Sequence, residues 1–219
     1  MVRIAGQSKN LNNFDTPSED VGALLMQRIA NKDRRAFESF YYDYTPRIGS
    51  FMMKLLKKPE LVDEAINEFM MTVWQSADHF DPTKGKLSTW LFGIAHNKVL
   101  KVLERQRRLW REESLERNDA DSTEHEWDAL AAETEANDPH TPERTVLGWE
   151  LGDILASTMD RLSPEHRTVL ELVFSENYGY EEVAVIMGCP VNTVKTRIFH
   201  ARKKLAELLA KRGYSPYDL

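Results

Sequence analysis

Hydrophobic residues recur along most of this chain at the three- and four-residue spacing of an α-helix. The clearest apolar stripe lies over 60–76, and the same period predicts helices over 19–31, 33–44 and 91–109. No segment alternates apolar and polar residues at length, as a strand would. We therefore predict an all-α protein.

The C-terminal third contains a helix-turn-helix pattern. In 178–187 four residues share one face that we expect to be buried: Tyr180, Val183, Ala184 and Met187. Gly188 can adopt the left-handed conformation that ends a helix, and Pro190 prevents that helix from continuing. A second helix then places Val194, Ile198 and Ala201 inward. Helix starts at Thr141-Pro142 and Ser163-Pro164 complete a predicted four-helix module.

The second helix of this motif is strongly basic. Residues 191–212 contain seven Lys and Arg against one acid, Glu207. Such a face can be merely solvated, but this charge in a chain of net −6 favours entry into a DNA major groove. The candidate DNA contacts are Asn192, Thr193, Lys195, Thr196, Arg197, His200, Arg202 and Lys203.

The net acidity of the chain is concentrated in one connector. Residues 112–144 have a local net charge of −10, which leaves the rest at +4. We predict two domains joined by a flexible acidic linker, which acts as a spacer, threads a basic channel of a partner, or mimics nucleic acid. The predicted divisions are a polar tail (1–18), an N-terminal domain (19–111), the linker (112–140), a C-terminal domain (141–212) and a tail (213–219).

Several function classes find no support in the sequence. No apolar run approaches the roughly 20 residues needed to span a bilayer, and the N-terminus lacks a signal-peptide core, so we expect a cytoplasmic protein without membrane insertion. A single cysteine, Cys189, allows no internal disulfide or cysteine metal cluster. The six histidines are scattered, and the fragment GKLS lacks the upstream glycine of a phosphate-binding loop. We predict no enzyme, catalytic residues, metal, cofactor or small-molecule substrate.

The N-terminal domain offers a second candidate nucleic-acid site. In the loop over 77–90, Phe80 and Trp90 could stack an unpaired base, Lys84 and Lys86 could neutralise phosphate, and Ser88 and Thr89 could donate hydrogen bonds, with Ser88 or Thr89 also a plausible helix cap. Alternatively, the two aromatic rings belong to the core. The following helix carries a polar stripe suited to a phosphate backbone: Asn97, Lys98, Lys101, Arg105 and Arg108.

An acidic face lies opposite the apolar stripe of the 60–76 helix. It consists of Asp63, Glu64, Asn67 and Glu68. It suits a basic partner surface, although a solvated helix face would have the same composition.

Two segments resemble a known family. Leu162–Leu209, LSPEHRTVLELVFSENYGYEEVAVIMGCPVNTVKTRIFHARKKLAELL, resembles the C-terminal promoter-reading domain of extracytoplasmic-function (ECF) sigma factors of bacterial RNA polymerase, and Val62–Arg108 resembles their N-terminal core domain. The resemblance implies that the acidic face binds core RNA polymerase through its largest subunits, β and β′. It also implies that the loop and the polar stripe melt and read a −10 element, that the helix-turn-helix reads a −35 element, and that an anti-sigma factor restrains the protein.

The resemblance is imperfect at two positions. Asn67 stands where the family usually has Gln, and His96-Asn97 stands where it commonly has Arg-Asn. If His96 replaces a phosphate contact, DNA binding weakens as the pH rises through the titration range of histidine.

Two other function classes stay open. One is a free-standing helix-turn-helix regulator with an N-terminal sensing or dimerisation domain, and the other is an adaptor that binds polymerase but no promoter.

Overall fold

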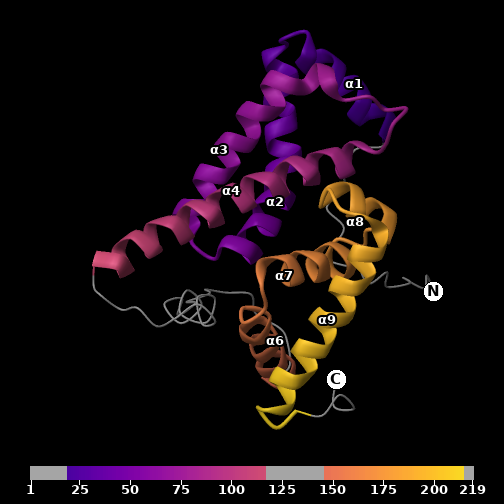
Figure 1. Cartoon of the computed structure of the whole chain (residues 1–219). Coiled ribbons are helices and arrows are strands. Elements are labelled where there is room, and N and C mark those ends of the chain that lie inside the picture. Colours follow the sequence, from indigo (N-terminus) through magenta and orange to yellow (C-terminus); the bar gives the residue numbers. More distant parts are fainter. Residues whose placement is uncertain (1–18, 117–145, 215–219) are drawn as a thin grey trace, which may run out of the picture.

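The structure is a computed structural model that describes residues 19–116 and 146–214, and it consists of two helical domains (Figure 1). No strand occurs in these two ranges, in agreement with the predicted all-α class. The N-terminal domain contains α1 (Glu19–Ala30), α2 (Arg34–Leu56), α3 (Pro59–Ser76), the 3-10 helix η1 (Ala77–His79) and α4 (Leu87–Glu116). The C-terminal domain contains α6 (Val146–Met159), α7 (Pro164–Leu170), the π-helical segment η2 (Glu171–Ser175), α8 (Tyr180–Ile186) and α9 (Val191–Ala210).

Some predictions lie outside the described residues. These are the two tails over 1–18 and 215–219, most of the linker (117–140) and the helix start at Thr141-Pro142. The predicted start of the linker at 112 falls within α4, which continues to Glu116. Among the described residues, none of the helices is both long and apolar enough to cross a membrane.

Helix α2 is longer than the sequence pattern predicts. The prediction that it ends at Tyr44 is wrong, because α2 continues through Pro46 to Leu56. A proline inside a helix costs about 3 kcal/mol. Beyond it, Phe51, Met52 and Leu55 are buried, and each buried side chain of this size contributes about 1.5–3 kcal/mol. Packing therefore outweighs the local penalty.

The helix-turn-helix forms as predicted, with one difference in its buried face. Gly188 has a φ of +60°, which few residues other than glycine adopt easily, and it turns the chain from α8 into α9. Tyr180 is 38% exposed, so its predicted burial is wrong. Since α8 begins at Tyr180, the buried face centres instead on Val183 and Ile186, one turn further along.

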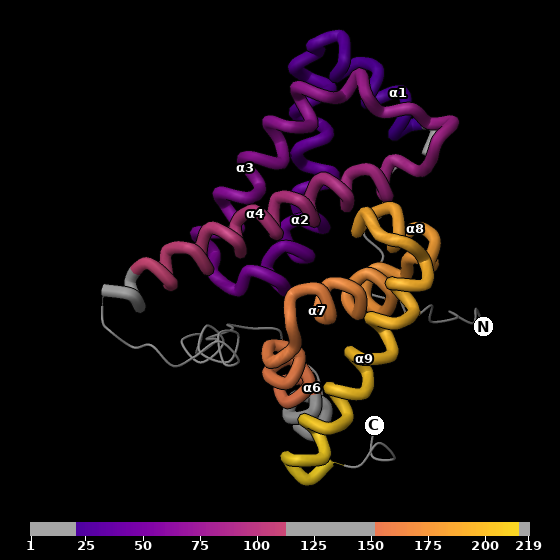
Figure 2. The backbone as a smooth tube through the Cα atoms, in the orientation of Figure 1, coloured from indigo at the N-terminus to yellow at the C-terminus, as the bar shows by residue number. Residues whose placement is uncertain are grey.

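The two domains pack against each other. Helix α8 lies against the N-terminal half of α4, as the ribbon and the backbone tube both show (Figures 1 and 2). A Cβ atom added to Gly93 of α4 would lie 4.0 Å from the Ile186 carbonyl oxygen, so the backbones approach closely here. Beside this crossing, the rings of Phe92 and Tyr178 meet with centroids 5.2 Å apart.

Candidate nucleic-acid interface

The outer face of α9 presents most of the predicted DNA contacts to solvent. Its cations Lys195, Arg202 and Lys203 are exposed, because the inward positions of the helix are filled by Val194, Ile198 and Ala201. Asn192, Thr196 and His200 are exposed as well, and Thr193 is half-buried. The helix-turn-helix therefore presents a polar, basic helical face, and a DNA major groove is wide enough to admit one α-helix.

Arg197 differs from the other α9 candidates. Its side chain turns toward the turn of the motif, where Nη1 lies 3.8 Å from the Cys189 Sγ, and the residue is half-buried. Its charge lowers the pKa values of His96 on α4 and His166 on α7, after the larger effect of burial. Arg197 thus lies near the boundary between the domains.

Phe199 is a functional candidate that the sequence reasoning missed. It is 65% exposed on α9, and its ring lies edge-on to His200 at 5.4 Å. An aromatic side chain exposed among DNA-binding candidates can contact the methyl group of thymine. The available signal was its position in the helix, because Phe199 falls outside the inward set formed by Val194 and Ile198.

The loop between η1 and α4 is built by a tight turn. Asp81 accepts hydrogen bonds from the Thr83 amide (3.0 Å) and hydroxyl (2.7 Å), and these bonds, with Lys84, hold the pKa of the Asp81 carboxyl below its usual range. The expected cap at Ser88 or Thr89 is wrong: α4 begins at Leu87, so both residues lie in its first turn.

The aromatic and cationic residues of this loop divide between core and surface. The rings of Phe80 and Trp90 pack together at 5.6 Å and lie partly buried against the core, and Thr89 is buried. The Lys84 side chain is exposed, whereas Lys86 Nζ lies 3.0 Å from Glu182 Oε1 of α8.

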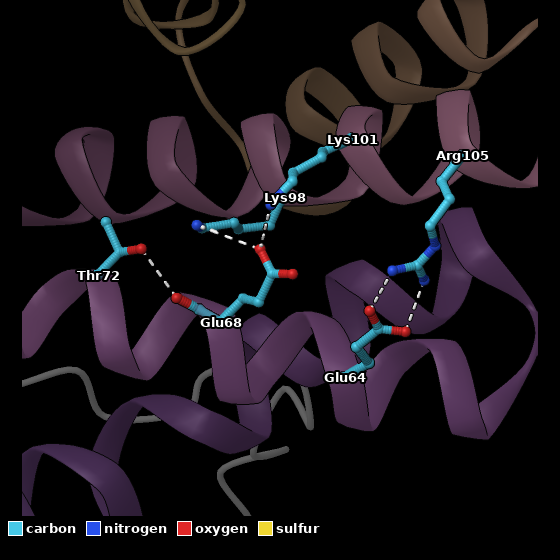
Figure 3. A network of polar contacts seen from close by, with 6 residues as sticks. All are labelled: Glu64, Glu68, Thr72, Lys98, Lys101 and Arg105. Carbon is cyan, nitrogen blue, oxygen red and sulfur yellow. Dashed lines mark hydrogen bonds and ion pairs between the residues drawn. The ribbon is translucent and has the colours of Figure 1, made fainter.

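The acidic face of α3 and the polar stripe of α4 pair with each other (Figure 3). Glu64 receives two hydrogen bonds from the Arg105 guanidinium, one of them 2.6 Å long from Nη2. Glu68 Oε2 lies 3.1 Å from Lys101 Nζ and 3.4 Å from Lys98 Nζ. Hydrogen bonding to Arg105 and Lys101, respectively, lowers the pKa values of Glu64 and Glu68.

This pairing separates the predicted residues of the two helices into two groups. Asp63 and Asn67 on α3, and Asn97 and Arg108 on α4, remain exposed to solvent. Glu64, Glu68, Lys98, Lys101 and Arg105 form the network between the helices. The spacing along each helix predicted the two faces but not that they would meet.

His96 is buried rather than available to phosphate. It is 3% exposed, and burial, with Arg197 nearby, lowers its pKa to about 4. The expectation that His96 contacts phosphate and makes binding weaken with rising pH is therefore wrong in this conformation: the imidazole is neutral near neutral pH. Within 19–116 and 146–214, no three His, Cys, Asp or Glu residues gather as metal ligands.

A helix-turn-helix with a basic outer face, packed on a second helical domain, is typical of a DNA-binding protein. The Sigma-70 region 2 model matches residues 40–109, and the Sigma-70 region 4 model matches residues 152–205. The ECF RNA polymerase sigma-E factor of Salmonella typhimurium is 30% identical over 183 residues, which cover 83% of this chain and 91% of that protein.

Two solved structures share the fold. One is the sigma factor RpoE in complex with the anti-sigma factor NepR from Bartonella quintana, with a TM-score of 0.59, 23% identity and coverage of 80% of this chain and 96% of that one. The other is CnrH in complex with the cytosolic domain of CnrY, with a TM-score of 0.57, 22% identity and coverage of 86% and 97%.

The chain belongs to the ECF sigma factors of RNA polymerase. It is an alternative sigma factor, which binds core RNA polymerase and promoter DNA and directs initiation to specific promoters.

Proposed function

We propose that this sigma factor divides promoter recognition between its domains. Helix α9 reads a −35 element, and the loop, together with the exposed residues of the α4 stripe, melts and binds a −10 element. The exposed basic face of α9 carries the proposal, because it places cations and amide groups where a major groove can accept them. Phe199 joins the predicted contacts. The factor works without enzymatic activity, cofactor or small-molecule substrate, in the cytoplasm where polymerase acts.

Polymerase binding belongs to the acidic face of α3. Asp63 and Asn67 make the first contact with the β′ and β subunits, because they are exposed while Glu64 and Glu68 already hold cations of α4. The prediction is that Asp63→Asn weakens pull-down of core polymerase about two- to fivefold, the effect of losing one rim charge. Asp78→Asn, a matched loss of an exposed acid on η1, leaves pull-down unchanged.

Run-off transcription, together with DNA binding in the absence of polymerase, separates the remaining classes. Core polymerase with this chain should initiate run-off transcription at promoters that core polymerase alone ignores. A free-standing regulator would instead bind duplex promoter DNA tightly without polymerase, and an adaptor would bind polymerase without changing promoter choice.

An anti-sigma factor is the proposed third partner. A cavity of about 520 Å³ lies where α2, α6, α7, η2 and α9 meet. Leu155, Phe174 and Leu205 form part of its wall, and its charged lining includes Lys54, Arg202, Asp160 and Glu171. Lys54 is already paired with Glu171 at 2.9 Å, so an amphipathic segment would fit the apolar wall with an acidic side chain placed to reach Arg202. A protein that co-purifies with the chain from its host should inhibit run-off transcription, and Phe174→Asp should relieve that inhibition more than Val185→Asp, at an exposed position on α8.

A further inference from the structure

The loop between η1 and α4 is held at both ends by the core of its own domain. At its start the Phe80 ring packs against Trp90, and the two rings lie partly buried. At its end Leu87 is buried, and α1 approaches it so closely that a Cβ atom on Gly22 would lie 2.8 Å from the Leu87 Cδ2. Residues 82–86 between these anchors are exposed. The loop therefore presents a short tip to solvent from a fixed base.

Asp81 shapes the backbone of this tip. Its carbonyl oxygen accepts a hydrogen bond from the Lys84 amide (3.0 Å), which closes a four-residue turn. Pro82 stands at the second position of that turn, where proline is favoured. The Asp81 side chain adds a second bond, because its Oδ1 accepts from the Thr83 amide (3.0 Å). Both bonds limit the conformations that Thr83 can adopt.

The hydroxyl of Thr83 has its one proton committed to Asp81. Thr83 Oγ1 lies 2.7 Å from Asp81 Oδ1. The hydrogen bonds from Thr83, with Lys84, keep the pKa of the Asp81 carboxyl below its usual range, so near neutral pH this carboxylate is ionised and can only accept. The shared proton therefore comes from Thr83. What the exposed Thr83 oxygen can still offer to a third group is its lone pairs, as a hydrogen-bond acceptor.

A hydrogen-bond acceptor on the tip distinguishes among the four bases. Adenine and cytosine carry an exocyclic amino group, N6 or N4, which donates hydrogen bonds. Guanine and thymine carry a carbonyl oxygen, O6 or O4, at the corresponding edge of the ring. A carbonyl oxygen facing the Thr83 oxygen would have no proton between them. An unpaired base that turns this edge toward Thr83 is therefore bound better when it is adenine or cytosine.

We propose, resting on the −10 role proposed above for the loop, that Thr83 selects an amino-bearing base in the melted strand and that Asp81 is the positioning residue that holds the Thr83 hydroxyl as an acceptor. Lys84 neutralises phosphate without regard to sequence. Its side chain is 83% exposed, and its ion pair with Asp81 Oδ2 (3.3 Å) keeps it beside the selecting oxygen. Affinity and selectivity of the tip therefore come from different side chains.

The test measures binding of the reconstituted holoenzyme to fork-junction DNA from a promoter that it transcribes. Each position of the single-stranded −10 segment carries A, C, G or T in turn. Replacing residues 82–85 by Gly-Ser-Gly-Ser identifies a position that the loop reads, because the base preference there should disappear. At that position the wild-type holoenzyme should prefer A or C over G and T about two- to tenfold, the range for one hydrogen bond.

Two outcomes of this measurement separate the inference from the proposed function. If replacement of the tip changes no base preference, the DNA role of the loop fails, and the inference fails with it. If the replacement removes a preference and that preference is for G or T, the loop reads DNA but the assignment of Thr83 as an acceptor is overturned.

Substitutions at the tip then test the separate roles. Thr83→Val removes the acceptor, and Asp81→Ala frees the hydroxyl to rotate and donate to G or T, so each should bring the preference close to one. Thr83→Ser retains the hydroxyl and should retain the preference. Lys84→Gln should weaken binding of all four probes alike, about two- to fivefold, and keep the preference.

Thr72→Val is the matched control, because it removes a threonine hydroxyl of the same domain that bonds the Glu68 carbonyl of α3 (2.8 Å). It should keep the wild-type preference, and a loss equal to that in Thr83→Val would contradict the proposal. An Asp81→Ala holoenzyme with the full preference would show that Asp81 does not position Thr83. Loss of the preference in Thr83→Ser would show that the hydroxyl is not the selecting group. Thermal unfolding of each variant confirms that the fold is retained.

Discussion

Helices α9 and α4 both carry a basic stripe, but the two stripes have different surroundings. The cations on the outer face of α9 are exposed, whereas Lys98, Lys101 and Arg105 of α4 are paired with two glutamates of α3. The difference teaches that a helical stripe of charge indicates a binding face only when no neighbouring helix supplies the counter-charge. On this comparison α9 is ready to bind DNA, and α4 has a large part of its charge engaged within its own domain.

The largest expected effect is a loss of stability at low pH, which comes from His96 on the buried side of α4. His96 has a folded pKa of about 4, below its unfolded value of 6.5. As the pH falls below 6.5, the unfolded chain binds a proton that the folded chain does not, so stability falls. The loss should be about 2 kcal/mol between about pH 7 and about pH 5, measured by urea unfolding.

Two variants test whether His96 causes this pH dependence (slope) of the unfolding free energy. His96→Gln should remove most of it and leave a smaller remainder from His166, whose pKa burial also lowers. His79→Gln, at an exposed position, should retain the full slope. A full slope in His96→Gln would show that His96 is not buried in solution.

Phe199 tests whether the open face of α9 reads bases. Phe199→Ala should reduce transcription from a −35-dependent promoter by about 1 kcal/mol, or about fivefold, the value of one buried apolar contact with a thymine methyl. The thermal unfolding midpoint of the Phe199→Ala protein should stay unchanged because the Phe199 ring is exposed. Val185→Ala, an exposed apolar residue on α8, is the control, and an equal loss there would indicate a general defect.

The smallest expected effect is on stability, and it comes from the ion-pair network between α3 and α4. Glu68→Gln removes the carboxylate shared by Lys98 and Lys101 and should cost under about 1 kcal/mol in urea unfolding, because the pair is partly exposed. Asp63→Asn, exposed on the same helix, should cost less. A loss of several kcal/mol would mean that the cations of α4 serve the fold rather than DNA.

The elements and the helix-turn-helix could be predicted from local patterns. Helical periodicity placed α1 and α3 almost to the residue, and Gly188 with Pro190 marked the turn between α8 and α9. The continuation of α2 through Pro46 could not be predicted, because it depends on burial against other helices.

Contacts between segments that are distant in the sequence could not be predicted for the same reason. Arg47 and Glu176 are 129 positions apart, and nothing near either one indicates its partner. The pairing of Glu64 with Arg105 depends on how α3 packs on α4. The candidate residues were therefore found by type and face, whereas their availability for binding came only from the packing.

The most direct test of the central claim, that α9 selects the promoter, is run-off transcription with reconstituted core polymerase on two templates that differ only in the −35 element. Lys195→Ala should lower transcription from the intact template by about 1–3 kcal/mol, or roughly five- to 150-fold, while leaving polymerase pull-down and the scrambled template unchanged. Lys211→Ala, just beyond the end of α9, should behave as wild type. Unchanged discrimination between the templates in Lys195→Ala would contradict the account.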